Sequence, residues 1–196
     1  MKPPRIVLLR PRNAENLGAI ARAMKNFGLT DWIVVSPNPT LLEAPGVHQL
    51  AVKSGDLLDS VRRVDSLELA VADCSWIVGT AMREIEGRRR LKPRELAREA
   101  ASRNDENWAL VFGDERHGLR ADDVRQCHAI STIATSDDQP SLNLSQAVVV
   151  YAYELMSAPS TSIGGPRAAP AVDHDLRQVR FSLDRALRLT GFLSDR

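Results

Sequence analysis

The stretch PPRIVLLRPRNAENLGAIARAMKNFGLTDWIVVSP, residues 3–37, decides the fold class of this chain. Short apolar, partly β-branched runs at Ile6–Leu9 and Trp32–Val35 predict buried strands. Between them, apolar residues recur at helical spacing over Leu17–Phe27 and predict a helix. A helix that joins two strands allows them to run parallel, because parallel strands need a long crossover connection. We therefore expect an α/β fold.

The same alternation of strands and helices continues along the chain. Further short apolar runs predict strands, and stretches with capping residues or apolar character predict helices. The strands are Trp76–Val78, Ala109–Phe112 and Ile130–Ala134, and the helices are Ser66–Asp73, Pro93–Ser102 and Leu144–Met156. This order predicts a mostly parallel sheet with helices on both faces.

By composition the chain divides into a domain, a linker and a terminal helix. Residues 1–156 carry the alternating pattern, whereas residues 157–172, SAPSTSIGGPRAAPAV, are rich in Pro, Gly and small residues and predict a linker. In residues 173–196, leucines mixed with arginines predict a basic amphipathic helix. Such a helix needs a surface to dock on: the main domain, a second copy, or a helical region outside this chain. The extension is either naturally short or truncated.

The charge of the chain is balanced overall but not locally. With 26 Lys and Arg against 25 Asp and Glu, the net charge of +1 gives no global attraction for a polyanion. Residues 1–30, however, carry six basic residues against Glu15 alone, and residues 83–103 carry eight against four Glu. A nucleic-acid partner would therefore have to bind at these basic segments.

The cysteines, histidines and N-terminus suggest where the protein works. Cys74 and Cys127 form no C-x-x-C pattern and are too few for a disulfide framework, which fits a reducing cytoplasm. The apolar run near the N-terminus is too short for a signal peptide or a membrane span. The histidines show no metal-ligand spacing with the cysteines. We expect a soluble cytoplasmic protein without a metal or a membrane partner.

Ligands of open α/β sheets bind beyond the carboxyl ends of the strands, so the loops there are the candidate site. The segment after the first strand contains N-x-G-x-x-x-R, formed by Asn16, Gly18 and Arg22. Arg22 would lie about one and a half turns into the helix. With Arg10 and Arg12 on the preceding loop, it could contact phosphates. The same residues also fit an N-cap, a tight turn and a solvated arginine.

The second loop, GDERHGL at residues 113–119, contains G-x-E-x-x-G. Gly113 and Gly118 permit positive φ angles and close backbone approach, as a ligand-binding turn needs, and would aim Glu115. A polar surface turn is the alternative. His117 could suggest acid–base catalysis, but no Ser or Asp partner is placed by the sequence, and we regard it as a bystander.

The third loop opens the segment QPSLNLSQAVVVYAYEL, residues 139–155. It places Ser141, Asn143 and Ser145 at the start of an apolar helix, where polar groups can bind a ligand. Ser141 or Asn143 could equally cap that helix. The presence of all three loops in order, each after a predicted strand, favours one shared site.

These segments, NAENLGAIARAMKNFGL, VFGDERHGL and PSLNLSQAVVVYAYEL, resemble the three motifs of the SpoU/TrmH branch of the SPOUT methyltransferases. RPRNAENLGAIARAMKNFGL, ADCSWIVGTAMR and the closing YAYEL resemble the TrmJ subgroup. The resemblance covers Arg5 to about Met156. It implies a C-terminal trefoil knot, S-adenosyl-L-methionine as the cofactor, a homodimer, and methylation of a ribose 2'-hydroxyl in RNA, specifically nucleotide 32 of tRNA.

The resemblance also implies roles for individual residues. The cofactor pocket would comprise Thr80, Ala81, Met82, Gly113, Ile133, Ser141, Leu142 and Asn143. The catalytic residues would be Arg22, Asn16, Glu115, Ser141 and Asn143. RNA phosphates would meet Arg10, Arg12, Arg83, Arg88, Arg89 and Arg90, although the last three also fit a solvated face. Because a guanidinium stays protonated in proteins, we expect Arg22 to stabilise negative charge rather than act as a base, with Glu115 orienting it.

Three alternatives remain open at this point. The first is 2'-O-methylation of another tRNA ribose or of rRNA. The second is a non-catalytic RNA-binding protein with the same fold, for which the full set of motif residues would be unnecessary. The third is a generic α/β nucleotide-binding enzyme, which the lack of a P-loop or G-x-G-x-x-G sequence disfavours.

Overall fold

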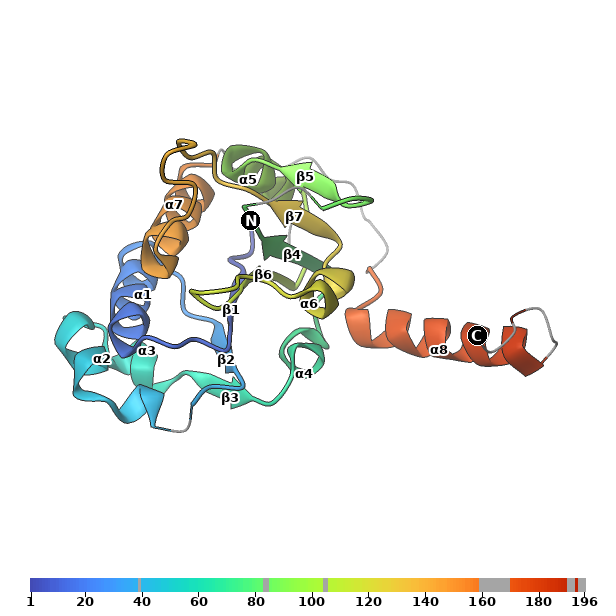
Figure 1. The fold of residues 1–196 in the computed structure, drawn as a ribbon, viewed down its shortest axis with the longest axis horizontal. Coiled ribbons are helices and arrows are strands. Elements are labelled where there is room, and N and C mark those ends of the chain that lie inside the picture. Colours follow the sequence, from blue (N-terminus) through green and yellow to red (C-terminus); the bar gives the residue numbers. More distant parts are fainter. Residues whose placement is uncertain (39, 83–84, 104–105, 159–169, 190–192, 194–196) are drawn as a thin grey trace.

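In the part of the chain that the structure describes, seven parallel strands form one central sheet (Figure 1). The structure is a computed structural model that describes residues 1–38, 40–82, 85–103, 106–158, 170–189 and 193. The strands are β1 (Arg5–Leu9), β2 (Trp32–Val35), β3 (Arg62–Val64), β4 (Trp76–Thr80), β5 (Arg89–Leu91), β6 (Trp108–Phe112) and β7 (Ala129–Ser131). They pair in the order β3-β2-β1-β6-β4-β7-β5, and every pair is parallel. The predicted α/β class is confirmed.

Helices cover both faces of this sheet. They are α1 (Ala14–Asn26), η1 (Leu41–Glu43), α2 (Pro45–Leu50), α3 (Gly55–Asp59), α4 (Leu67–Val71), α5 (Pro93–Ser102), α6 (Ala121–Gln126), α7 (Leu144–Ser157) and α8 (Asp173–Leu189). Helices α1, α2, α3, α5 and α7 pack on one face, whereas α4 and α6 pack on the other. Within the described residues, no helix combines the length and apolar character that a membrane crossing requires.

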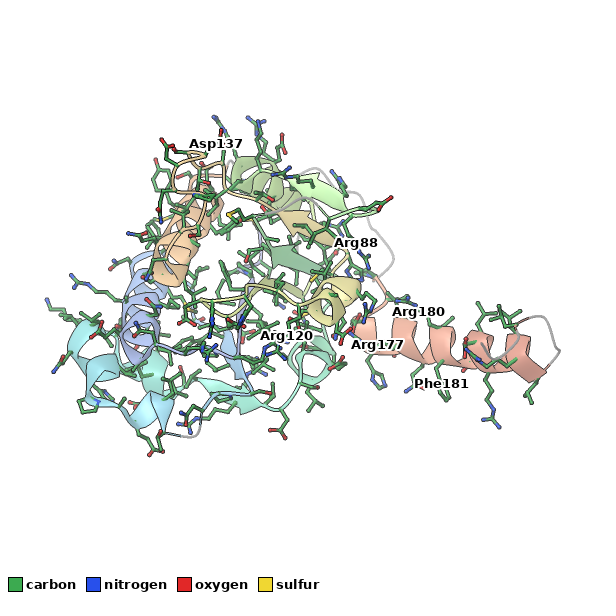
Figure 2. All side chains as sticks on the ribbon, in the orientation of Figure 1. Arg88, Arg120, Asp137, Arg177, Arg180 and Phe181 are labelled. Carbon is green, nitrogen blue, oxygen red and sulfur yellow. The ribbon has the colours of Figure 1, made fainter. Side chains whose placement is uncertain are left out.

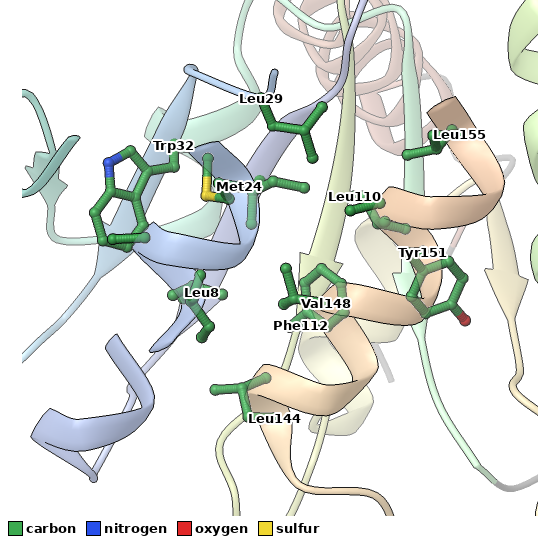
Figure 3. Close-up of a cluster of buried hydrophobic side chains, with 14 of the residues drawn as sticks. Leu8, Met24, Leu29, Trp32, Leu110, Phe112, Leu144, Val148, Tyr151 and Leu155 are labelled. Atoms are coloured by element: carbon green, nitrogen blue, oxygen red, sulfur yellow. The ribbon is translucent and has the colours of Figure 1, made fainter. Parts of the chain in front are cut away.

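The apolar strand residues divide between the two faces because side chains alternate along a strand. Ile6 and Leu8 of β1 belong to one buried cluster, and Val7 and Leu9 belong to the other. Figure 3 shows the first cluster, where α7 packs against the sheet and α1. There the rings of Phe112 and Tyr151 meet edge to face at 5.7 Å between centroids. This packing holds α7 against the sheet, and the first turn of α7 borders the candidate site.

The structure differs from the sequence prediction at two strands that were missed and one that is shorter. β3 and β5 are short edge strands, and their arginines face solvent, so neither shows the apolar run of a buried strand. The predicted strand Ile130–Ala134 was too long, because β7 ends at Ser131 and the chain then turns along the rim of a cavity.

Helix α1 also begins earlier than predicted. Its N-cap is Asn13, whose side chain accepts a hydrogen bond from the backbone N–H of Glu15 over 2.8 Å. Asn16, the expected start of this helix, therefore lies in the first turn and has its side chain free for another contact. The predicted helix Pro93–Ser102 matches α5 at both ends.

Helix α8 docks on the domain through its first turn. The backbone N–H of Asp173 donates to the carbonyl of Cys74 over 2.7 Å, and Arg177 donates to Oε1 of Gln126 over 3.2 Å. Further along, Val179 and Phe181 are 64% and 67% exposed, and Figure 2 shows Phe181 on the part of α8 that extends away from the sheet. Most of the predicted linker, 159–169, lies outside the described residues. The division into domain, linker and extension, and the trefoil knot, stay predictions.

Candidate active site

The loops after β1 and β6 are joined by one carboxylate. Because β1 and β6 are neighbouring parallel strands, the segments that follow them emerge side by side. Glu115 accepts hydrogen bonds from the backbone N–H groups of Arg12 and Asn13 over 2.9 and 3.1 Å. It also accepts from Nδ2 of Asn16 over 3.0 Å. Glu115 thus holds the start of α1 against the second loop.

The third loop joins the same network through Asn143. Nδ2 of Asn143 donates to Oδ1 of Asn16 over 2.9 Å, while Oδ1 of Asn143 caps α7 by accepting from the backbone N–H of Ser145 over 2.8 Å. The capping role considered for Asn143 and a role in the site are therefore combined in one side chain. All three loops meet in space.

Two glycines of the motifs are required for close packing. A Cβ on Gly113 would lie 2.0 Å from the carbonyl carbon of Gly118, and Gly118 itself has a φ of 65°. The loop can close on itself only because Gly113 has no side chain, and Gly118 adopts its positive φ at little energetic cost. A Cβ on Gly18 would lie 2.1 Å from the carbonyl oxygen of Val47, so this glycine lets α1 pack against α2. Gly18 therefore serves helix packing and not a turn.

A cavity of about 320 Å³ opens beside these loops, within the size range of small-molecule sites. Its wall includes most of the predicted cofactor residues, namely Thr80, Ala81, Met82, Gly113, Ile133, Ser141 and Leu142, and it includes Glu115. Asn143 caps α7 and does not line the cavity. Apolar side chains that the sequence did not single out, Phe112, Leu119, Leu144 and Tyr151, complete it.

The cavity offers both apolar surface and backbone hydrogen-bonding groups. Ile133, Ser141 and Leu142 make no backbone hydrogen bond with any other described residue, so their N–H and C=O groups are available to a ligand. Such groups at the edge of an otherwise apolar cavity can orient a bound molecule. Burial raises the pKa of Tyr151 well above its ordinary range, so this phenol stays neutral.

The second loop carries a second carboxylate, Asp114, that is held by hydrogen bonds. Burial alone would raise the pKa of Asp114, but hydrogen bonds from the backbone N–H groups of His117 and Arg116 lower it below its ordinary value. Asp114 therefore stays ionised and fixes the turn. The His117 ring is half exposed, at 53%, and lies 3.2 Å from Asp114. An Asp partner that the sequence did not indicate is thus present, but it is engaged in the turn.

Arg22 lies on the exposed side of α1 and is absent from the cavity wall of its own chain. Its guanidinium makes no hydrogen bond or ion pair with the rest of the described chain. Glu115 does not contact it within the described chain, and the expectation that Glu115 orients Arg22 stays a prediction. The carboxylate is instead occupied by α1 itself, because three N–H groups converge on it.

The arginines expected to bind RNA phosphates differ in their contacts within the protein. Arg12 is exposed, whereas Arg10 donates to Asp123 with its two terminal nitrogens. Arg88, labelled in Figure 2, donates to the backbone carbonyl of Arg125 over 2.9 Å. Arg89 pairs with Glu99 at 2.9 Å, and Arg90 donates to Thr132 over 3.2 Å. Arg83 lies outside the described residues.

Asp123 is the residue of this region that sequence reasoning missed. It lies in the first turn of α6, where an acidic side chain is common because it interacts favourably with the helix dipole. That signal predicts only a cap. Nothing in the sequence indicates that Asp123 also pairs with Arg10, which is 113 residues away.

The similarity to known proteins is high over the whole domain. Residues 3–153 match the family model described as the SpoU rRNA Methylase family. The chain belongs to the SpoU methylase family. A curated member from Klebsiella pneumoniae, named tRNA (cytidine/uridine-2'-O-)-methyltransferase TrmJ, is 37% identical over 201 residues, which cover 96% of this chain and 80% of that protein.

Solved structures agree with this SpoU-family assignment. The crystal structure of TrmJ from Z. mobilis ZM4 matches with a TM-score of 0.85 and 31% identity, over 97% of this chain and 82% of that one. A putative methylase family protein from Neisseria gonorrhoeae matches with a TM-score of 0.79 and 29% identity, over 91% and 92% of the two chains. The sheet and helices described above are therefore those of SpoU-family methylases.

Proposed function

We propose that this chain transfers a methyl group from S-adenosylmethionine to a ribose 2'-hydroxyl of tRNA. As a member of the SpoU methylase family it is a methyltransferase. The observation that carries the proposal is the convergence of the three motif loops beside one cavity. The curated relatives named as tRNA (cytidine/uridine-2'-O-)-methyltransferases support tRNA as the substrate.

The cavity fits the cofactor by its chemistry as well as its size. S-adenosylmethionine has an adenine ring, which needs apolar walls and a few hydrogen-bonding groups at its edge. Met82, Leu142 and Tyr151 offer such walls, and the open backbone groups of Ile133 and Ser141 could pair with the ring edge. Gly113 lines the cavity at the carboxyl end of β6, and its lack of a side chain lets Gly118 close the loop that forms the wall.

The chain's own residues must activate the ribose. A hydroxyl is a weak nucleophile at neutral pH and has to be held in line with the methyl group while its proton departs. When bound, the cofactor supplies a methyl group on a positively charged sulfur, and its leaving group is neutral. Arg22 would hold the adjacent RNA phosphate and stabilise negative charge on the 2'-oxygen. The proton would pass to a phosphate oxygen or to water.

We further propose that the enzyme works as a homodimer. One side of α7 is buried in the core, but Val149, Tyr153 and Met156 on its other side are 41%, 59% and 67% exposed. A second copy docked on this apolar surface would bury it. Since Arg22 does not line the cavity of its own chain, a neighbouring copy could complete the site.

The finer details of the substrate follow from the resemblance. We propose nucleotide 32 as the target and the cytoplasm as the location. Arg12 and the exposed arginines Arg89 and Arg90 of β5 are the proposed phosphate contacts. Because such contacts release counterions, affinity for tRNA should fall steeply as salt is raised. Another tRNA ribose, or a ribose of rRNA, is the alternative target.

The experiment is incubation of the purified chain with unmodified tRNA, unmodified rRNA and isotope-labelled S-adenosylmethionine, followed by mass-spectrometric location of the label. We expect label on the 2'-oxygen of nucleotide 32 in tRNA. Label on the 2'-oxygen of another ribose would support the same reaction and assign it to a different target nucleotide. Tight tRNA binding with no label on either RNA would support a protein that binds RNA without turnover, and would contradict the proposal.

A further inference from the structure

An ion pair outside the cavity joins the residue that follows β1 to α6, the helix that follows the Gly113–Leu119 loop of the cavity wall. Nη2 of Arg10 donates to Oδ2 of Asp123 over 2.5 Å, and Nη1 donates to Oδ1 over 3.3 Å. Both side chains are largely withdrawn from solvent, at 23% and 8% exposure. A two-point pair between partly buried groups has a defined geometry and is weakly screened by salt.

The backbone of Arg10 is shaped to make this contact. Arg10 directly follows β1, and its N–H still donates to the carbonyl of Val35 over 2.8 Å, so the end of the strand is fixed. Its φ of 51° is in the left-handed region, which residues other than glycine adopt rarely and at an energetic cost. The conformation turns the chain away from the strand at Arg10, whose side chain reaches α6.

Asp123 is in turn tied to the cavity wall. Its Oδ2 accepts a hydrogen bond from the backbone N–H of Arg120 over 2.7 Å, at the point where the Gly113–Leu119 loop ends and α6 begins. Most of that loop lines the cavity. Glu115 holds the middle of the loop to the start of α1, whereas Arg10 and Asp123 hold its end to the end of β1.

We infer that Arg10 and Asp123 are positioning residues, which set the Gly113–Leu119 wall at the distance that S-adenosylmethionine binding requires. The inference rests on the proposed function, because it takes that cofactor as the occupant of the cavity. It also assigns Arg10 to the protein and not to RNA. The guanidinium already bonds a carboxylate at two points, and a phosphate would have to displace that carboxylate.

The test compares Arg10→Met, Asp123→Asn and the double variant with the wild-type chain. Met keeps the length of the side chain without its charge, and Asn keeps an oxygen that can accept from Arg120. We expect each single variant to bind S-adenosylmethionine about tenfold more weakly by calorimetry, and the double variant no more weakly than either single one, because both remove the same pair. Amide hydrogen exchange in the Gly113–Leu119 loop should quicken in all three.

Two further variants separate a positioning role from general destabilisation, and a tRNA-binding measurement separates it from RNA contact. Arg10→Lys keeps one charged bond to Asp123 and should recover most of the cofactor affinity. Arg62→Met breaks an exposed ion pair with Asp31, before the start of β2, and should leave cofactor affinity unchanged. Affinity of Arg10→Met for tRNA, measured without cofactor over a salt series, should match the wild type.

Unchanged cofactor affinity in Arg10→Met and Asp123→Asn would overturn the inference while leaving the proposed function intact. If Arg10→Met, unlike the other variants, loses affinity for tRNA, and that affinity depends less on salt than in the wild type, the inference is also overturned. Arg10 is then an RNA contact. A wild-type chain that binds no S-adenosylmethionine would overturn both the inference and the proposed function.

Discussion

Asn143 donates a hydrogen bond from Nδ2 to Oδ1 of Asn16 over 2.9 Å, across 127 residues of sequence. Asn16 also contacts the second loop, since its own Nδ2 donates to Glu115 over 3.0 Å. The amide group can accept with its oxygen on one side and donate with its nitrogen on the other. The Asn16 side chain, 6% exposed, therefore links the three motif loops.

Replacing Asn16 by Asp should break this link at the Glu115 side. The new carboxylate would face the Glu115 carboxylate with no proton between them, while still accepting from Asn143. We expect a loss of about 2 kcal/mol in the free energy of unfolding at neutral pH, measured with urea. The loss should shrink as the pH is lowered and one carboxylate becomes protonated. An equal loss at all pH values would contradict this explanation.

Gly18→Ala should destabilise the chain although alanine favours helices. The added Cβ would lie 2.1 Å from the carbonyl oxygen of Val47, so α1 and α2 would have to separate. Overpacking of this kind costs about 1–3 kcal/mol, more than the gain of about 1 kcal/mol in helix propensity. Gly55→Ala is the matched control, since a Cβ there meets no atom within 4 Å. A melting temperature unchanged in Gly18→Ala would refute the packing role.

The stability of the chain should fall as the pH falls below about 6.5, in part through His128. Burial lowers the pKa of His128 below its ordinary value of 6.5, and the ring nitrogen Nδ1 accepts a hydrogen bond from the N–H of Ile77. The unfolded chain therefore takes up this proton first, and each step down in pH favours unfolding. His128→Asn keeps an acceptor without titrating, and its unfolding free energy should depend less on pH between 7.5 and 5.5. Identical profiles would argue against this role.

Tyr153→Glu should convert the proposed dimer into monomers. It places a charge in the middle of the exposed apolar side of α7, where desolvation on association would be costly. Leu69→Glu is the matched control, because Leu69 is 61% exposed on α4, on the other face of the sheet. Sedimentation velocity should give a dimer for the wild type and Leu69→Glu and a monomer for Tyr153→Glu. A monomeric wild type at micromolar concentration would contradict the proposal.

The sequence predicts the buried parts of this fold and not its edges. β1 and β2 carry continuous apolar runs because both of their faces are covered, and such runs are visible in sequence. β3 and β5 carry exposed arginines and are defined only by their pairing with β2 and β7. Helix α5 is predicted at both ends because Pro93 marks its start and the periodicity stops at Ser102.

The candidate site is predictable to the extent that local motifs encode it. The loops of Asn16, Glu115 and Asn143 were expected to meet, and they do. The pairing of Arg10 could not be foreseen, because a positive φ at an arginine and a partner 113 residues away leave no local pattern. The sequence likewise gives no reason to expect that three N–H groups donate hydrogen bonds to the Glu115 carboxylate.

The most direct test of the proposed mechanism compares cofactor binding and methyl transfer in the same variant, Arg22→Ala. Calorimetry with S-adenosylmethionine and single-turnover transfer to unmodified tRNA should be measured on wild type and variant. We predict cofactor affinity within about twofold of the wild type and transfer slower by about a thousandfold, because the RNA phosphate and the 2'-oxygen lose their partner and the cofactor does not. Equal losses of cofactor affinity and transfer, or transfer at the wild-type rate, would contradict the account.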